Sequence, residues 1–141
     1  MNTFRFSDMK LGLKEEFQVT VTEEMQKSFS AISGDLNPLH IDKDFARKSG
    51  YKDVVVYGML TASFYSTLVG MYIPGKYGLF QECKVSFNKP VCINDTLKVT
   101  GEVSEINEVF KRITIKAYIT NENGKKVSKA KLIAGFLGEK K

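Results

Sequence analysis

The stretch GMLTASFYSTLVGMY, residues 58–72, decides how this chain folds. It lies within a longer segment, residues 54–75, that contains no charged side chain. Apolar and weakly polar residues occur on every side of a helix drawn from this stretch, so other elements must cover the helix. We therefore expect a buried central helix that begins at Gly58 and stops at Pro74-Gly75, with small residues that let a sheet approach closely.

The uncharged segment 54–75 is long enough to span a bilayer, but it contains several Gly, Ser and Thr residues and a Pro. These residues favour a buried helix over a membrane span. The N-terminus lacks the apolar run of a signal peptide. Cys83 and Cys92 match the spacing of neither a metal motif nor a redox pair. We expect a cytoplasmic protein whose two cysteines are reduced packing residues.

After residue 75 the sequence changes to alternating apolar and polar residues, which is typical of strands. The expected strands are Phe80–Asn88, Thr96–Val103, Phe110–Thr120 and Lys125–Leu137, with an earlier strand at Phe17–Val21. Asn123-Gly124 favours a tight hairpin between the last two. The pattern predicts one α+β domain over residues 1–141: a four-strand antiparallel meander, with the early strand added, wrapped around the long central helix.

The segment between the early strand and the central helix predicts two short helices. Thr22 is placed to cap the first, and Gly34 ends it. Asp42 is placed to cap the second, and Gly50 ends it. Residues with helical spacing on the apolar face of the first helix are Met25, Phe29 and Ile32.

The stretch SGDLNPLH, residues 33–40, contains the only histidine of the chain, five residues after Asp35. A carboxylate beside an imidazole can exchange protons with water near neutral pH. Asp35 and His40 can cooperate only if the chain turns back, and Asn37-Pro38 is a pair that makes such a turn. The same residue types also make an ordinary helix-ending turn, so on the residues alone both interpretations stay open.

Gly58, at the start of the central helix, is the second candidate for chemistry. The first amides of a helix have no partner within the helix, and the helix dipole adds partial positive charge there. The Gly58 amide could hold a carbonyl oxygen that becomes an enolate. Gly58 could equally serve only to turn the chain into the helix.

Together these two motifs resemble the MaoC-like family of (R)-specific enoyl-CoA hydratases, which have the hot-dog fold. The resemblance covers nearly the whole chain and is densest in residues 29–42 and 57–63. It implies syn addition of water to a trans-2-enoyl thioester, giving an (R)-3-hydroxyacyl thioester. It also implies an enzyme without a metal or a cofactor. The substrate would be carried as a thioester of CoA or of acyl carrier protein.

The resemblance also implies roles for particular residues. Asp35 and His40 would activate the water and move its protons, and the Gly58 amide would polarise the thioester carbonyl. Tyr57 stands where the family commonly has histidine, which bears on substrate preference. The candidate substrate-binding residues are Asn37, Tyr57 and Ser63.

The formal net charge of +5 is either a solvated face or a surface that attracts phosphates or an acidic partner. No nucleic-acid-binding motif accompanies it. An open sheet edge in such a fold predicts a homodimer or a higher oligomer. Three alternatives to the hydratase remain: a 3-hydroxyacyl-[acyl-carrier-protein] dehydratase, a thioesterase, and a non-catalytic module that binds acyl-CoA.

Overall fold

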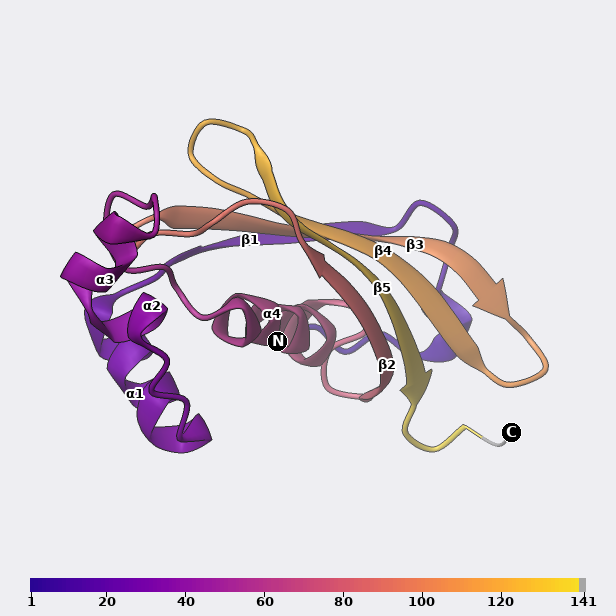
Figure 1. Cartoon of the computed structure of the whole chain (residues 1–141). Coiled ribbons are helices and arrows are strands. Elements are labelled where there is room, and N and C mark those ends of the chain that lie inside the picture. Colours follow the sequence, from indigo (N-terminus) through magenta and orange to yellow (C-terminus); the bar gives the residue numbers. More distant parts are fainter. Residues whose placement is uncertain (140–141) are drawn as a thin grey trace.

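A five-stranded antiparallel sheet curls around one helix in the computed structural model, which describes residues 1–139 (Figure 1). The strands are β1 (Lys14–Thr20), β2 (Gly78–Phe87), β3 (Thr96–Asn107), β4 (Arg112–Thr120) and β5 (Lys126–Phe136). The helices are α1 (Glu23–Ser33), α2 (Pro38–Ile41), α3 (Lys43–Lys48) and α4 (Gly58–Thr67), with a 3-10 turn η1 (Phe6–Asp8) and a π-helical turn η2 (Leu68–Tyr72). The α+β class and the helix inside the sheet are confirmed.

The strand order is β1-β3-β4-β5-β2, so the predicted four-strand meander is wrong at one connection. β3, β4 and β5 form a meander, but β2 pairs with β5 at the far edge and not with β3. The reason lies in residues 88–95, which are too long for a tight hairpin and contain Pro90. This segment crosses the end of the sheet, where Cys92 forms an isolated bridge with Val55.

The side of α4 that faces the sheet forms the core together with the inward side chains of β3, β4 and β5. Gly101 of β3 lets the sheet approach the central helix closely, because a Cβ at this position would lie only 2.6 Å from the Leu68 side chain. The buried Tyr65 hydroxyl donates to Ser128 Oγ at 2.9 Å, and Ser128 donates onward to the Ser86 carbonyl on β2. Burial raises the pKa of Tyr65 to about 12, against an opposing effect of the Ser128 hydrogen bond. These contacts fix α4 against β5 and β2.

The central helix differs from the prediction in two ways. It stops as an α-helix at Thr67 and continues as the wider turn η2. It is also not covered on all sides, because Met59, Ser63, Ser66 and Gly70 follow one another along an exposed stripe. The small residues of this stripe face away from the chain's own sheet, although the sequence analysis placed them against it. Within residues 1–139, no helix has the length and apolar character needed to cross a membrane.

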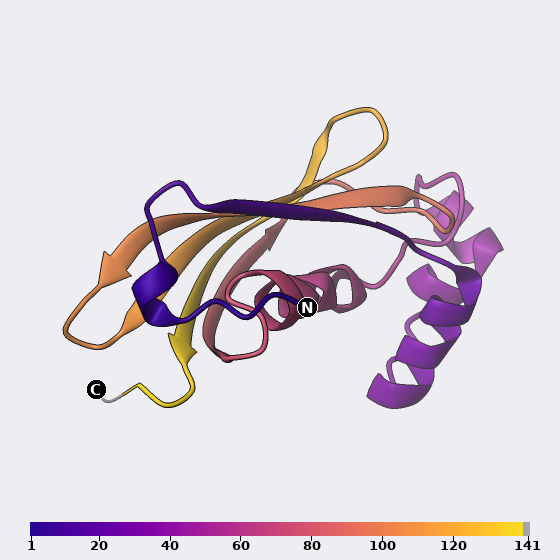
Figure 2. The same cartoon turned by 180° about the vertical axis from the view of Figure 1, so that it is seen from behind.

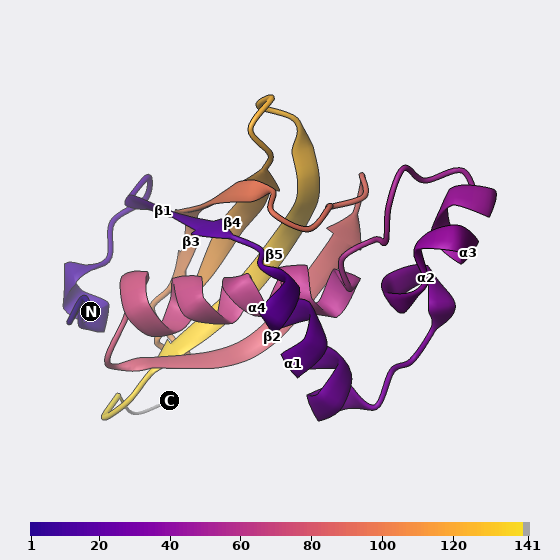
Figure 3. The ribbon, with the colours of Figure 1, turned by 90° about the vertical axis from the view of Figure 1, so that its left-hand side faces the viewer.

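Helices α1, α2 and α3 lie together beyond one end of the sheet, next to the start of α4 (Figure 3). The predicted caps are confirmed: Thr22 Oγ1 accepts from the Met25 amide, and Asp42 Oδ1 accepts from the Phe45 amide. Gly34 ends α1 in the left-handed conformation, at φ 72°. Ile32 is 83% exposed, so its predicted place in the apolar face of α1 is wrong for a single chain.

The N-terminal segment runs along the open side of α4 (Figure 2). It is fixed there by a bridge between Thr3 and Gly75 and by a hydrogen bond from the Asn2 amide to the Met71 carbonyl. A Cβ at Gly75 would lie 2.1 Å from the Asn2 carbonyl oxygen, so only glycine permits this contact. The segment therefore closes the end of the core next to η2, away from α1–α3.

Candidate active site

His40 lies on α2, a short helix that the sequence analysis did not predict. Pro38 is its first residue, a position where the missing amide hydrogen costs nothing. His40 Nδ1 lies 2.7 Å from the Val55 carbonyl oxygen. Because a carbonyl can only accept, Nδ1 carries a proton and donates it. This hydrogen bond fixes the orientation of the ring and leaves Nε2 as the nitrogen available for proton transfer.

Gln26 on α1 joins the three backbone segments of the site, and its side chain is buried. Its amide nitrogen donates to the carbonyls of His40 and Val55, each at 3.1 Å. Its oxygen accepts from the Tyr57 amide at 3.3 Å. A single side chain therefore ties α2, the Val55 segment and the residue before α4 to α1.

Tyr57 connects His40 to the turn that carries Asp35. Its ring stacks on the imidazole with a centroid distance of 4.1 Å. It also contacts the ring of Phe29 on α1, with a centroid distance of 5.0 Å. Its hydroxyl donates to the Asp35 carbonyl. Tyr57 is buried, and its hydroxyl already has an acceptor, so the position holds the histidine and the turn together. Contact between Tyr57 and substrate stays a prediction.

Asp35 is exposed, and its side chain serves its own turn. Oδ1 accepts from the Asn37 amide at 3.0 Å, as in an Asx turn, and the Asp35 amide donates to Ser33 Oγ at 3.2 Å. Within residues 1–139, no hydrogen bond or ion pair joins the Asp35 carboxylate to His40. The helix-ending turn, one of the two interpretations of residues 33–40, is therefore present. A water shared by the Asp35 carboxylate and the His40 imidazole stays a prediction.

A hollow of about 360 Å³ lies between the start of α4 and the end of β2, and both His40 and Gly58 line it. The Gly58 amide has no acceptor in the described part of the chain, as expected for the first residue of a helix. Phe87 forms part of the wall, and a Cβ at Gly58 would lie 3.3 Å from its ring. His40 and Gly58, whose amide is reinforced by the helix dipole, therefore both line one cavity, and His40 also lines a neighbouring hollow beside Gln26.

The other four predicted residues do not line this hollow: Asp35, Asn37, Tyr57 and Ser63. Asn37 caps α2, with Oδ1 accepting from the Leu39 amide at 3.0 Å. Ser63 lies on the exposed stripe of α4, and its hydroxyl donates to the Leu60 carbonyl at 2.6 Å. Substrate contacts by Asn37 and Ser63 stay predictions.

Two residues of the site escaped the sequence analysis, Gln26 and Thr61. Thr61 lines the hollow one turn after Gly58, and its buried hydroxyl has no hydrogen-bond partner within residues 1–139. A buried polar group without a partner is unfavourable, so water or substrate is expected to satisfy it. The only signal for Gln26 was a polar residue directly after Met25, on a helix in which Met25 and Phe29 are partly buried.

Both cysteines are free thiols, as expected, but Cys83 is exposed and therefore not a packing residue in the single chain. Among the described residues, no three His, Cys, Asp or Glu side chains lie close enough to hold a metal ion.

The sheet wrapped around α4, with a cavity at the leading end of that helix, defines a hot-dog protein. The chain belongs to the MaoC-like family, because residues 7–125 match the family model described as "MaoC like domain". It is 30% identical over 115 residues to the (R)-specific enoyl-CoA hydratase of Rhodospirillum rubrum, covering 82% of this chain and 80% of that protein. It is 35% identical over 97 residues to the (R)-specific enoyl-CoA hydratase of Aeromonas caviae, covering 69% and 72%. The unliganded R-hydratase of Pseudomonas aeruginosa superposes with a TM-score of 0.90 at 27% identity, covering 97% of this chain and 88% of that one.

Proposed function

We propose that this protein adds water reversibly to a trans-2-enoyl-CoA and forms the (R)-3-hydroxyacyl-CoA. The observation that carries the proposal is the shared cavity, which is lined both by His40, an imidazole with one free nitrogen, and by Gly58, whose helix amide is unpaired in the described chain. The names of the two hydratase relatives support the same reaction.

The reaction requires one proton acceptor, one proton donor and one group that stabilises negative charge. Water loses a proton to the Asp35–His40 pair as its oxygen forms a bond to C3. The electrons of the C2–C3 double bond move toward the thioester carbonyl, and the Gly58 amide stabilises the enolate oxygen. The pair then delivers a proton to C2, so that one water is added overall and the pair ends with the number of protons it began with. The division of the two transfers between Asp35 and His40 stays open, since such groups titrate as a pair.

Two contacts support a role for Asp35 beside His40 in this proposal. Tyr57 holds the Asp35 carbonyl with its hydroxyl and packs its ring on the imidazole. The Asx turn leaves the second carboxylate oxygen, Oδ2, free of intrachain partners in the described chain. The carboxylate can therefore bind water without giving up the hydrogen bond that shapes its turn.

A second copy of the chain completes the proposed enzyme. β2 is an open edge strand of ten residues, and unpaired edge strands promote association. Its apolar residues Leu79, Phe80 and Phe87 are exposed, as is Met59 at 60% on the α4 stripe. We expect a homodimer with twice the chain mass of 15.9 kDa, measurable by light scattering coupled to size exclusion. A species that stays at 15.9 kDa at the concentrations used for assays contradicts this expectation.

The test of function uses crotonyl-CoA and longer trans-2-enoyl-CoAs, with loss of the enoyl thioester absorbance followed in time. Chiral analysis of the product is expected to give the (R)-3-hydroxyacyl-CoA. Release of free thiol identifies a thioesterase, and turnover restricted to the carrier-linked substrate identifies the acyl-carrier-protein dehydratase. Thermal stabilisation by acyl-CoA without any chemical change identifies a binding module.

A further inference from the structure

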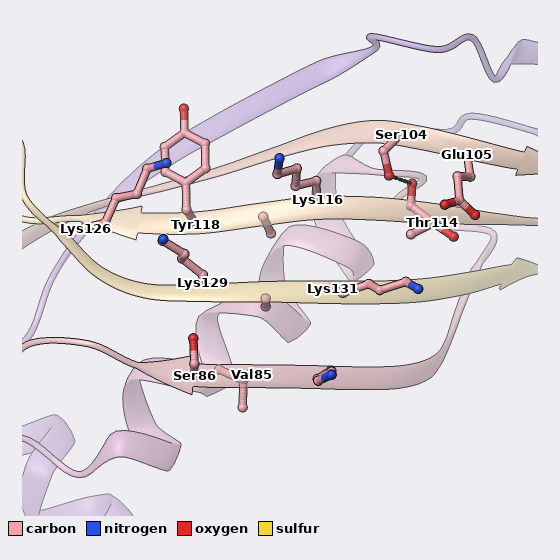
Figure 4. A pocket seen from close by; sticks show the side chains of 13 residues that line it. Val85, Ser86, Ser104, Glu105, Thr114, Lys116, Tyr118, Lys126, Lys129 and Lys131 are labelled. Carbon is pink, nitrogen blue, oxygen red and sulfur yellow. Dashed lines mark hydrogen bonds between the residues drawn. The ribbon is translucent and has the colours of Figure 1, made fainter.

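The face of the sheet opposite α4 carries a lysine-lined groove of about 460 Å³ (Figure 4). We call it the lysine groove and define it by its five ammonium-bearing residues, Lys84, Lys116, Lys126, Lys129 and Lys131. They come from β2, β4 and β5, and all five are exposed. The groove shares no lining residue with the His40 cavity.

Three of these lysines stand side by side across the strands. Lys84 pairs in register with Lys131, and Lys131 pairs in register with Lys116. Neighbouring strands are about 4.8 Å apart, so the row spans about 10 Å. Like charges placed directly opposite each other destabilise a sheet. Lys131 has a lysine on both sides, an arrangement that costs stability unless an anion neutralises it.

In the described part of the chain, the five lysines of the groove are not held in ion pairs. None of the five lysines makes an ion pair within 4.0 Å in the described residues, where the salt bridges involve Lys27, Lys98 and Lys111. Carboxylates lie nearby: Glu102 pairs in register with Lys116, Glu105 lines the groove, and Glu82 lines a neighbouring hollow with Lys84 and Lys131. The whole chain has 21 Lys and Arg against 16 Asp and Glu, so outside these five lysines the charges balance.

Hydroxyl groups and a ring complete the groove. Ser86, Thr114 and Tyr118 lie among the lysines, and Tyr118 is directly opposite Lys129 in the sheet. Lys126 lies over the Tyr118 ring, with its ammonium nitrogen 4.6 Å from the centroid. Phosphate oxygens accept hydrogen bonds from both ammonium and hydroxyl groups. The volume of the groove is in the range of small-molecule sites.

From these observations we infer that the lysine groove binds an oligophosphate, the chain of adjacent phosphates found in inorganic polyphosphates and nucleoside triphosphates. Several linked phosphates match ammonium groups distributed over about 10 Å, whereas a single phosphate reaches only part of the row. An acidic carrier protein docked here would hold its thioester on the side of the sheet away from His40. The groove is therefore a second binding site and not part of substrate delivery.

Calorimetric titration of the whole protein with inorganic tripolyphosphate, at two salt concentrations, tests the inference. The variants are K84Q/K116Q/K131Q and a control that removes the same charge from exposed lysines elsewhere, K10Q/K48Q/K52Q. We expect saturable binding of one tripolyphosphate per chain, at least tenfold weaker binding by the groove variant, and less than a twofold change in the control. Equal loss in both variants, or no saturable binding by the wild type, overturns the inference.

Thermal unfolding of K131Q distinguishes a ligand-binding lysine from one that only stabilises the fold. Without ligand, K131Q is expected to unfold at a higher temperature than the wild type, because the middle charge of the row is gone. Tripolyphosphate is expected to raise the unfolding temperature of the wild type more than that of K131Q. A lower unfolding temperature of K131Q without ligand contradicts the claim that the row of lysines destabilises the unliganded protein.

Competition experiments distinguish the sources of the oligophosphate. Displacement of tripolyphosphate by ATP identifies a nucleotide as a ligand, and binding of tripolyphosphate without displacement identifies an inorganic chain. A raised KM for crotonyl-CoA in K84Q/K116Q/K131Q, but not in the control, would mean that the groove holds the substrate's own phosphates. That result, or binding of an acidic carrier protein where tripolyphosphate fails to bind, overturns the separate site.

Discussion

The two members of the proposed catalytic pair are held in different ways. His40 is half-buried and fixed by contacts from α1, the Val55 segment and Tyr57. Asp35 is exposed, and its carboxylate binds only the backbone of its own turn. The imidazole is therefore oriented before substrate arrives, whereas the carboxylate depends on the turn and on the Tyr57 hydroxyl. Changes to the supports of each residue should accordingly have different consequences.

The largest expected effect comes from removing either member of the pair. Asp35→Asn keeps an oxygen that can accept from the Asn37 amide, so the Asx turn survives while the charge is lost. Asp35→Asn and His40→Ala are each expected to lower kcat by about 10²–10⁴. The kcat of the double variant should be at most about tenfold lower than the kcat of the less active single variant, because the two groups act as a unit. Circular dichroism checks that each variant is folded, and a variant with a tenth of wild-type turnover excludes that residue from the pair.

Gly58 offers a way to remove one amide hydrogen without removing a side chain. Proline is favoured at the first position of a helix, and Tyr57 already has the extended conformation that a following proline requires, at φ −53° and ψ 128°. Gly58→Pro is expected to lower kcat by about 10²–10³ relative to Gly58→Ala. Gly58→Ala is the matched control, since both side chains place a Cβ beside Phe87 but alanine keeps the amide hydrogen. Equal kcat values for the two variants would show that the amide does not stabilise the enolate.

Gln26 supports the histidine side of the pair. Gln26→Leu removes two donors to carbonyl oxygens and the acceptor of the Tyr57 amide. We expect a loss of about 1–3 kcal/mol in the free energy of unfolding. Because His40 and the start of α4 lose their common support, kcat should fall about 10- to 100-fold with little change in KM. Gln26→Glu keeps the acceptor for Tyr57, so recovery of kcat in that variant would show which contact matters.

Tyr57 supports the aspartate side. Tyr57→Phe removes the donor to the Asp35 carbonyl but keeps the ring that stacks on His40. The expected fall in kcat is about tenfold, smaller than for Gln26→Leu, since the Asx turn remains. Steady-state kinetics over a range of pH checks the comparison. A fall larger than that of Asp35→Asn would mean that the hydroxyl acts on the substrate directly.

The sequence predicts the parts of this molecule that short-range chemistry decides. The caps at Thr22 and Asp42 and the end of α1 at Gly34 depend on contacts within a few residues, and each prediction is confirmed. The inward face of β4 follows from alternation alone. The pairing of β2 with β5 instead of β3 depends on where the whole sheet closes around α4, which no local pattern encodes.

The candidate site shows the same division. The motif in residues 33–40 and the start of α4 pointed to His40 and Gly58, and the structure brings both to one cavity. Gln26 could not be assigned, because its partners lie 14 to 31 residues away and all are backbone atoms, which any sequence supplies. The exposed stripe of α4 could not be foreseen from the composition of a helix that is apolar or weakly polar on every side.

The smallest expected effect on kcat concerns Tyr65, which anchors α4 to the sheet and takes no part in the proposed proton transfers. Its pKa is raised from 10.0 to about 12 in the folded protein because the hydroxyl is buried. The unfolded chain therefore loses this proton first as the pH rises above 10, and stability that is complete below pH 10 decreases until the folded protein also ionises near pH 12. This residue alone contributes a slope of up to about 1.4 kcal/mol per pH unit across that window. Tyr65→Phe should cost about 1 kcal/mol at neutral pH by losing the bond to Ser128, leave kcat unchanged, and flatten the decline above pH 10. Urea unfolding at pH 8, 10 and 11 measures both effects, and parallel declines for the two proteins would show that Tyr65 ionises as easily in the fold as outside it.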